Sequence, residues 1–194
     1  MVDVSEWLLV SASTAKSTTL RVFVWRQLRR LGAVHLGPSV CLVPKLPTVS
    51  EAVTRMVNRV SADGGRARVF VVTLTAEDAE QVMAEQRADR DREYAEVLDR
   101  VPAFLAEIEM ETERGRATYT EVEESEADLG RFERWLDSIR SRDYFDAPGS
   151  ARTVAAVEGC RAALADFEAK AVVADTALDE DRLAADDPPV KGIT

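Results

Sequence analysis

The chain has 194 residues, 46% of them apolar, and a formal net charge of −10 at pH 7. That length and apolar fraction are enough to bury the core of one large domain or two small ones. No stretch approaches the roughly 18 uninterrupted apolar residues of a membrane-spanning helix, and the first residues lack the basic and apolar segments of a signal peptide. We therefore expect a folded, cytoplasmic protein with no membrane partner.

The net charge hides two halves of opposite sign. Residues 1–75 contain 10 Lys+Arg and 4 Asp+Glu, which gives a net charge of +6. Residues 76–194 contain 15 Lys+Arg and 31 Asp+Glu, which gives a net charge of −16. The acidity of the whole chain argues against a nucleic-acid partner, but the basic first half does not.

The first half predicts alternating strands and helices. The apolar run 7–10 predicts a strand, and residues 18–31 have helical periodicity that Gly32 ends. Two short β-rich runs, 33–36 and 40–43, flank a Gly-Pro-Ser turn and predict a hairpin.

A second helix and a last strand follow the hairpin. Thr48-Val49-Ser50-Glu51 has the pattern of a capping box, and Asp63-Gly64-Gly65 closes the helical segment. A strand over 67–72 completes the order βαββαβ, which is the order of the ferredoxin-like fold. We therefore predict an α+β protein whose residues 1–75 form a ferredoxin-like domain, with two helices on one face of a four-stranded antiparallel sheet.

The pattern of residues 76–183 predicts an all-α antiparallel lobe of three acidic helices. The composition of residues 184–194 predicts a disordered tail. The first helix has Thr75 as its N-cap, and Pro102 kinks or restarts it. Its apolar seam consists of Tyr94, Leu98, Val101, Leu105 and Ile108. The next two seams consist of Val122, Leu129, Phe132, Leu136 and Ile139, and of Val157, Cys160, Leu164, Phe167 and Ala171.

The helix at 18–31 separates into two faces when its residues are placed at about 100° intervals. The apolar side contains Leu20, Phe23, Val24, Leu28 and Leu31. The opposite side collects Arg21, Val22, Trp25, Arg26 and Arg29, with Arg30 at its edge. Guanidinium groups bind phosphates bidentately and an exposed indole ring can stack, so this side is a candidate DNA-binding face. Alternatively, it packs on the acidic helical half and buries Trp25.

The sequence contains no recognisable catalytic or metal-binding set. His35 is the only histidine, and Cys41, in the same hairpin, is interpreted as a small core residue. Carboxylates near 107–113 and 121–126 are interpreted as a solvated surface, because di-iron bundles supply Glu-x-x-His pairs. We predict no catalytic residue, metal or cofactor, and no disulfide between Cys41 and Cys160.

Four segments resemble the N-terminal domain of ChrB, the chromate-responsive regulator of bacterial chromate-resistance operons. They are residues 21–33 (RVFVWRQLRRLGA), 40–44 (VCLVP), 119–124 (YTEVEE) and 132–143 (FERWLDSIRSRD). ChrB proteins of the longer type carry a further C-terminal chromate-resistance domain, and the resemblance covers the N-terminal module.

The resemblance implies a transcriptional repressor that binds double-stranded operator DNA as a homodimer. The likeliest contacts are Arg21, Trp25, Arg26, Arg29 and Arg30. Chromate or another oxyanion is the implied effector, with Arg114, Arg116, Arg131 and Arg134 as candidate ligands around the helical loops. Equally, Arg131 and Arg134 pair with neighbouring carboxylates along the surface. The alternative function is an accessory or small-molecule-binding module, or an enzyme, in which the Arg/Trp face docks the helical lobe.

Overall fold

The structure, a computed structural model, describes residues 5–14, 17–114 and 119–185. By their contacts these residues form two compact units. One contains the chain up to Glu93 together with Ser138–Ser150, and the other contains Tyr94–Asp137 together with the chain from Ala151.

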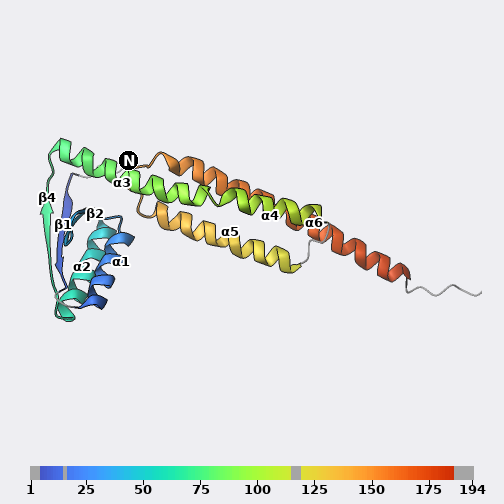
Figure 1. Ribbon diagram of the computed structural model, residues 1–194, viewed down its shortest axis with the longest axis horizontal. Helices are drawn as coiled ribbons and strands as arrows, with labels where there is room; N and C mark the ends of the chain where they lie inside the picture. Colours follow the sequence, from blue (N-terminus) through green and yellow to red (C-terminus); the bar gives the residue numbers. More distant parts are fainter. Residues whose placement is uncertain (1–4, 15–16, 115–118, 186–194) are drawn as a thin grey trace, which may run out of the picture. The chain divides into compact units, whose positions relative to one another are not determined.

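The first unit contains an antiparallel sheet of four strands, which are β1 (Trp7–Ser13), β2 (Val34–Gly37), β3 (Val40–Pro44) and β4 (Arg66–Val72). Their spatial order is β2-β3-β1-β4, so β1 pairs with both β3 and β4. The helices α1 (Thr18–Arg30) and α2 (Pro47–Ala62) lie side by side on one face (Figure 1). The α+β class and the predicted hairpin are confirmed.

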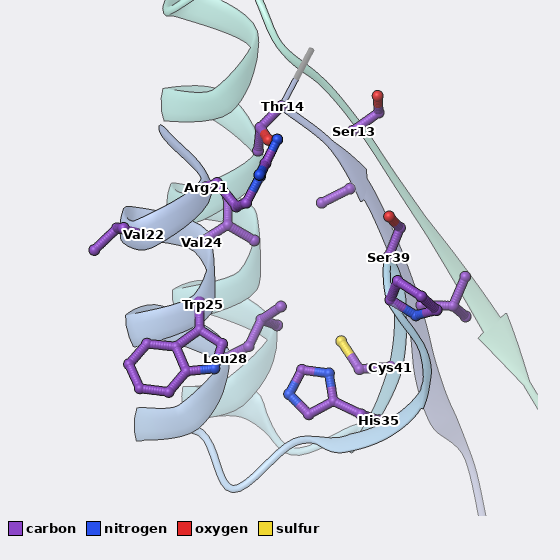
Figure 2. Close-up of a pocket in the computed structure, with 13 residues that line it drawn as sticks. Ser13, Thr14, Arg21, Val22, Val24, Trp25, Leu28, His35, Ser39 and Cys41 are labelled. Atoms are coloured by element: carbon purple, nitrogen blue, oxygen red, sulfur yellow. The ribbon is translucent and has the colours of Figure 1, made fainter. Parts of the chain in front are cut away.

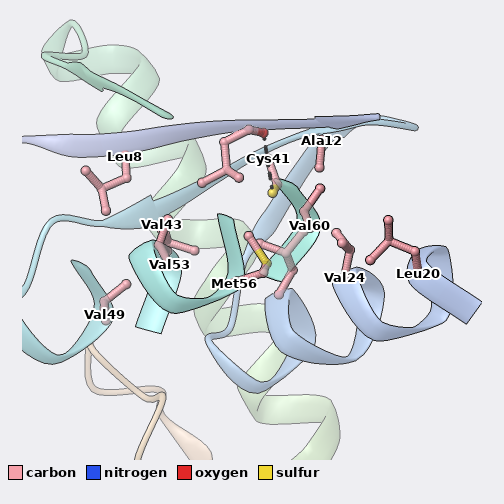
Figure 3. Packing of buried hydrophobic residues seen from close by; sticks show 12 residues of the cluster. Leu8, Ala12, Leu20, Val24, Cys41, Val43, Val49, Val53, Met56 and Val60 are labelled. Atoms are coloured by element: carbon pink, nitrogen blue, oxygen red, sulfur yellow. Dashed lines mark hydrogen bonds between the residues drawn. The ribbon is translucent and has the colours of Figure 1, made fainter. Parts of the chain in front are cut away.

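Side chains that alternate along β1 and β3 meet the two helices in the main core. Val43 points from the sheet toward Val53 of α2 (Figure 3). Val10, Met56 and Val60 belong to the same cluster, and all five residues are buried. The register explains this arrangement, because Val10 lies opposite Cys41 and Leu8 lies opposite Val43, on the same face of the pleat.

The start of α2 differs from the predicted capping box. The helix begins at Pro47, its N-cap is Leu46, and no side chain caps it. Proline fits the first turn of a helix because a backbone N–H there would have no acceptor within the helix. The helix therefore begins at Pro47, one residue before the predicted cap, and Thr48 lies inside it. By contrast, Thr75 caps the next helix as predicted, since its Oγ1 accepts from the backbone N–H of Asp78.

The second face of the sheet is covered by residues distant in sequence. Trp7 and Leu42 on this face pack with Val82 of α3 (Ala76–Leu98) and with Phe145. The Trp7 and Phe145 rings have centroids 5.7 Å apart. The loop after α5 therefore belongs to the core of the sheet unit.

The second unit consists of helical segments. The long helix expected from residue 76 is two helices, α3 and α4 (Val101–Glu113), because the chain restarts with Pro102 in the first turn of α4. They are followed by α5 (Tyr119–Arg140) and α6 (Gly149–Ala185). The disordered tail was predicted to begin at residue 184, but α6 continues to Ala185, and residues 186–194 lie outside the described part of the chain. No helix in the described ranges is long and apolar enough to cross a membrane.

The packing of these helices follows the predicted seams with two corrections. Val97 is fully buried, whereas Leu98, which was predicted for the seam, is only partly buried. Phe104 is 5% exposed whereas Leu105 is 36% exposed, so Phe104 occupies the seam position that was predicted for Leu105. Phe104 packs edge-on against Phe132 of α5, with ring centroids 5.6 Å apart. The seam of α6 is confirmed, since Val157, Cys160, Leu164, Phe167 and Ala171 are all buried.

Both cysteines are free and buried. The Cys41 thiol donates to the Val10 carbonyl oxygen at 3.8 Å, and burial raises its pKa to about 11. Burial also raises the pKa of Cys160. Because the thiolate is the reactive form, neither cysteine is poised as a nucleophile.

We predict that both thiols react at least about tenfold more slowly with a disulfide reagent at about pH 8 in the native protein than after unfolding in guanidinium. Absorbance after addition of the reagent measures this difference. A stoichiometric burst from the native protein would contradict the buried positions.

Candidate nucleic-acid interface

Helix α1 carries the candidate interface, and its ends are well defined. Ser17 is the N-cap, and its hydroxyl accepts from the backbone N–H of Leu20 at 3.2 Å. Arg29 and Arg30 occupy the last turn, where cations interact favourably with the helix dipole. Leu20, Val24 and Leu28 are buried against the sheet and α2.

The predicted polar face of α1 is exposed. Arg21, Val22, Trp25, Arg26, Arg29 and Arg30 are all exposed in the structure. Trp25 has a relative exposure of 49%, so the sheet unit itself does not bury the indole. The Arg29 guanidinium lies over the Trp25 ring, 5.3 Å from its centroid, in a cation–π arrangement.

The α1 arginines lack acidic partners within the described part of the chain. None of Arg21, Arg26, Arg29 and Arg30 makes an ion pair there, and α1 itself contains no acidic residue. Some exposed arginines elsewhere do pair, since Arg59 binds Asp63 at 2.7 Å, whereas Arg66 and Arg68 on β4 make no ion pair within the described residues. The positive charge of α1 is therefore available to an external anion.

A hollow of about 190 Å³ lies on this face. It is lined by Trp25, Arg26, Arg29, Arg30 and Arg142. Arg142 comes from the turn after α5, so a second segment of the chain contributes positive charge beside α1. The hollow has room for a phosphate group among guanidinium donors. We call this hollow together with the exposed α1 arginines the basic face.

The C-terminal end of α1 is held by side chains from two other segments. Gln86 of α3 donates to the Gly32 carbonyl oxygen at 2.8 Å, and the Tyr144 hydroxyl donates to the Leu31 carbonyl oxygen at 3.3 Å. These two carbonyls belong to the C-cap and to the residue after it, so the two contacts anchor the chain at the point where α1 ends.

A buried charge cluster lies behind this anchor. Glu93 accepts from Arg142 at 2.8 Å and lies 3.2 Å from the Nε of Arg90. Arg90 is only 5% exposed, and its Nε and Nη1 make no hydrogen bond. Desolvation by burial lowers the pKa of Arg90, and the nearby Glu93 carboxylate partly offsets this. One carboxylate thus serves two arginines. The sequence offered no signal for this cluster, because charged residues on a helix are usually solvated.

The four predicted effector arginines occupy separate surroundings. Arg114 pairs with Glu111 at 2.6 Å, Arg131 pairs with Asp128, and Arg134 is exposed on α5. Arg116 lies outside the described residues. Arg131 therefore makes the local ion pair that the sequence offered as the alternative. Among the described residues, no group of three or more His, Cys, Asp or Glu side chains is placed to hold a metal ion.

The fold and this site define an α+β protein with an exposed basic helix. The family model described as "Protein ChrB, N-terminal" matches residues 21–178, and the chain belongs to this family. It is 31% identical over 151 residues to Protein ChrB of Cupriavidus metallidurans. The match covers 75% of this chain and 42% of that protein, so the chain spans less than half the length of this relative. No solved structure matches the chain.

Three glycine substitutions test how tightly the end of α1 is held. Gly32 has a φ of +60°, and a Cβ there would approach Arg90 Nη1 to 2.8 Å. Gly64 also has a positive φ, but a Cβ there would contact no other atom. Gly37 has the same free space around its Cα and no positive φ. We predict that Gly32→Ala lowers the free energy of unfolding by about 1–3 kcal/mol, more than Gly64→Ala, and that Gly37→Ala has almost no effect.

Denaturant unfolding followed by fluorescence measures these differences. Equal destabilisation by Gly32→Ala and Gly64→Ala would show that the contact with Arg90 adds nothing to the backbone strain.

Proposed function

We propose that this chain is a ChrB-type transcriptional regulator that binds operator DNA through the basic face of α1. The observation that carries the proposal is the set of exposed arginines of α1 without carboxylate partners, arranged around an exposed tryptophan. Membership of the ChrB family agrees with a role in the regulation of chromate resistance.

The geometry of α1 suits a phosphate backbone. Arg21 and Arg29 lie on the same side of the helix, about 12 Å apart along its axis. Duplex DNA presents roughly seven phosphates over that length when both strands are counted. Arginine binds phosphate oxygens with two parallel hydrogen bonds, so two or more such contacts would fix the orientation of the helix on the duplex.

The net charge of −10 does not oppose this binding. Salt screens exposed charges beyond about 10 Å at ordinary ionic strength, so DNA responds to the charges that lie closest to it. Those charges are positive on α1, because none of its residues is acidic. Contacts of this kind supply affinity, whereas sequence discrimination requires further contacts with base edges.

The ferredoxin-like assignment of the sheet unit belongs to the same proposal. The antiparallel order β2-β3-β1-β4, with α1 and α2 on one face, supports it. In this arrangement α1 belongs to the outer layer of the unit, and its arginine-bearing face points away from the sheet.

We predict that Arg26→Ala and Arg29→Ala each weaken binding to duplex DNA and each reduce the slope of log affinity against log salt by about one. Because phosphate contacts carry no sequence information, the loss is expected to be similar for different duplexes. Fluorescence anisotropy of labelled duplexes over a range of salt concentrations measures both quantities.

Arg55→Ala is the matched control, because Arg55 is an exposed helical arginine on α2 that pairs with Glu51 at 3.7 Å. It is expected to leave the salt slope unchanged. If the wild type does not bind DNA at low salt, or if Arg26→Ala and Arg55→Ala behave alike, the accessory-module alternative replaces the regulator.

A further inference from the structure

A cavity of about 570 Å³ lies between α1 and the β2–β3 hairpin. Figure 2 shows α1 on one side and the hairpin with the end of β1 on the other. Its volume is within the range of about 300–1,000 Å³ that is typical of small-molecule sites. The residues that matter for its chemistry are Thr14, Arg21, Trp25, Leu28, His35 and Ser39.

One end of the cavity is polar and carries a positive charge. The Arg21 side chain extends toward Thr14 at this end (Figure 2). Within the described residues, the Arg21 guanidinium makes no hydrogen bond or ion pair, and no residue that lines the cavity is acidic. The Thr14 and Ser39 hydroxyls add neutral donors to the lining. This combination fits one negatively charged group on a ligand.

The other end is mainly apolar. The His35 ring lies between Cys41 and Leu28 here, with the Trp25 indole on the adjacent turn of α1 (Figure 2). Leu28 is buried, and the Cys41 thiol already donates to the Val10 carbonyl oxygen. Apart from the imidazole, these surfaces offer contact area to a planar ring rather than further partners for a charged group.

We propose that this cavity binds a small planar organic anion, such as an aromatic carboxylate. Its carboxylate accepts from the Arg21 guanidinium, and its ring lies among Trp25, Leu28 and His35. The size of the cavity separates this class from an inorganic oxyanion, which would contact Arg21 and leave the apolar end unfilled.

The site also implies a form of regulation that rests on the proposed DNA-binding function. Arg21 and Trp25 belong both to the cavity and to the exposed face of α1. A bound carboxylate neutralises Arg21 and holds Trp25 against its ring, so both side chains are withdrawn from a phosphate backbone. The ligand and DNA should therefore weaken each other's binding by the same factor.

The test uses the full chain with 2-naphthoate as the probe, and with the neutral 2-naphthamide and chromate as comparisons. The chain contains one histidine, so its imidazole NMR signals report on this cavity alone. We expect 2-naphthoate to shift the His35 signals in a saturable way with a Kd below about 10 mM, and 2-naphthamide to bind at least about tenfold more weakly.

Arg21→Gln and Arg26→Gln form a matched pair, because both arginines are exposed on α1 and Arg26 does not line this cavity. Arg21→Gln should weaken 2-naphthoate binding at least about tenfold, and Arg26→Gln should leave it unchanged. His35→Gln, followed by the indole N–H NMR signal of Trp25, should also weaken 2-naphthoate binding and provides a second variant if Arg21→Gln does not fold.

Three results would overturn the proposal. They are no saturable shift with 2-naphthoate up to about 10 mM, equal binding of the amide and the acid, and chromate binding at His35 as tightly as 2-naphthoate. Loss of DNA binding in Arg26→Gln with 2-naphthoate binding retained confirms the two sites separately. Binding of 2-naphthoate by a chain that does not bind DNA would contradict only the regulatory coupling.

Discussion

The burial of one stripe of α1 determines the arrangement of the candidate site. Leu20, Val24 and Leu28 are spaced by four residues and all face the sheet, so the rotation of the helix about its axis is fixed. Burial of one such side chain contributes about 1.5–3 kcal/mol, and a rotation that hid Trp25 would lose roughly 5–9 kcal/mol. Surface ion pairs worth about 0–1 kcal/mol each cannot offset that loss. The packing of α1 on the sheet therefore keeps its arginines on the outer side of this unit.

The direction of α1 depends on contacts that come from later in the chain. Gln86 and Tyr144 donate to the two carbonyls that directly follow the helix, and the cluster of Arg90, Glu93 and Arg142 is packed behind them. Removal of one partner from a buried ion pair typically costs about 3–5 kcal/mol. This cluster thus ties the basic face to α3 and to the loop after α5, within a single compact unit.

Local patterns in the sequence predicted the elements and the division of α1 into an apolar and an arginine-rich face, because periodicity and turn residues act over a few positions. The βαββαβ order, the hairpin, the free cysteines and the seam of α6 were all predicted in this way. The Thr48 cap failed because Pro47 fits the first turn without a side-chain cap. Leu105 was preferred to Phe104 because spacings of three and four both fit a helical seam.

Features that depend on distant residues were not predicted. The segment around Phe145 has the sequence pattern of a loop, yet Phe145 packs on Trp7 in the sheet. The burial of Arg90 could not be predicted from the sequence pattern, since charged residues on a helix are usually solvated. The cavity beside Arg21 requires the end of β1, α1 and the hairpin together, so no single motif indicates it.

The central claim is that DNA contacts this chain through α1. Backbone amide and indole NMR signals, recorded while a short duplex is added at low salt, test it most directly. The account predicts that the largest shifts fall on α1, on the indole N–H of Trp25 and on the residues around Arg142, and that they disappear as salt is raised. Shifts confined to α2, β4 or the helices of the second unit, or no shifts at all, would contradict it.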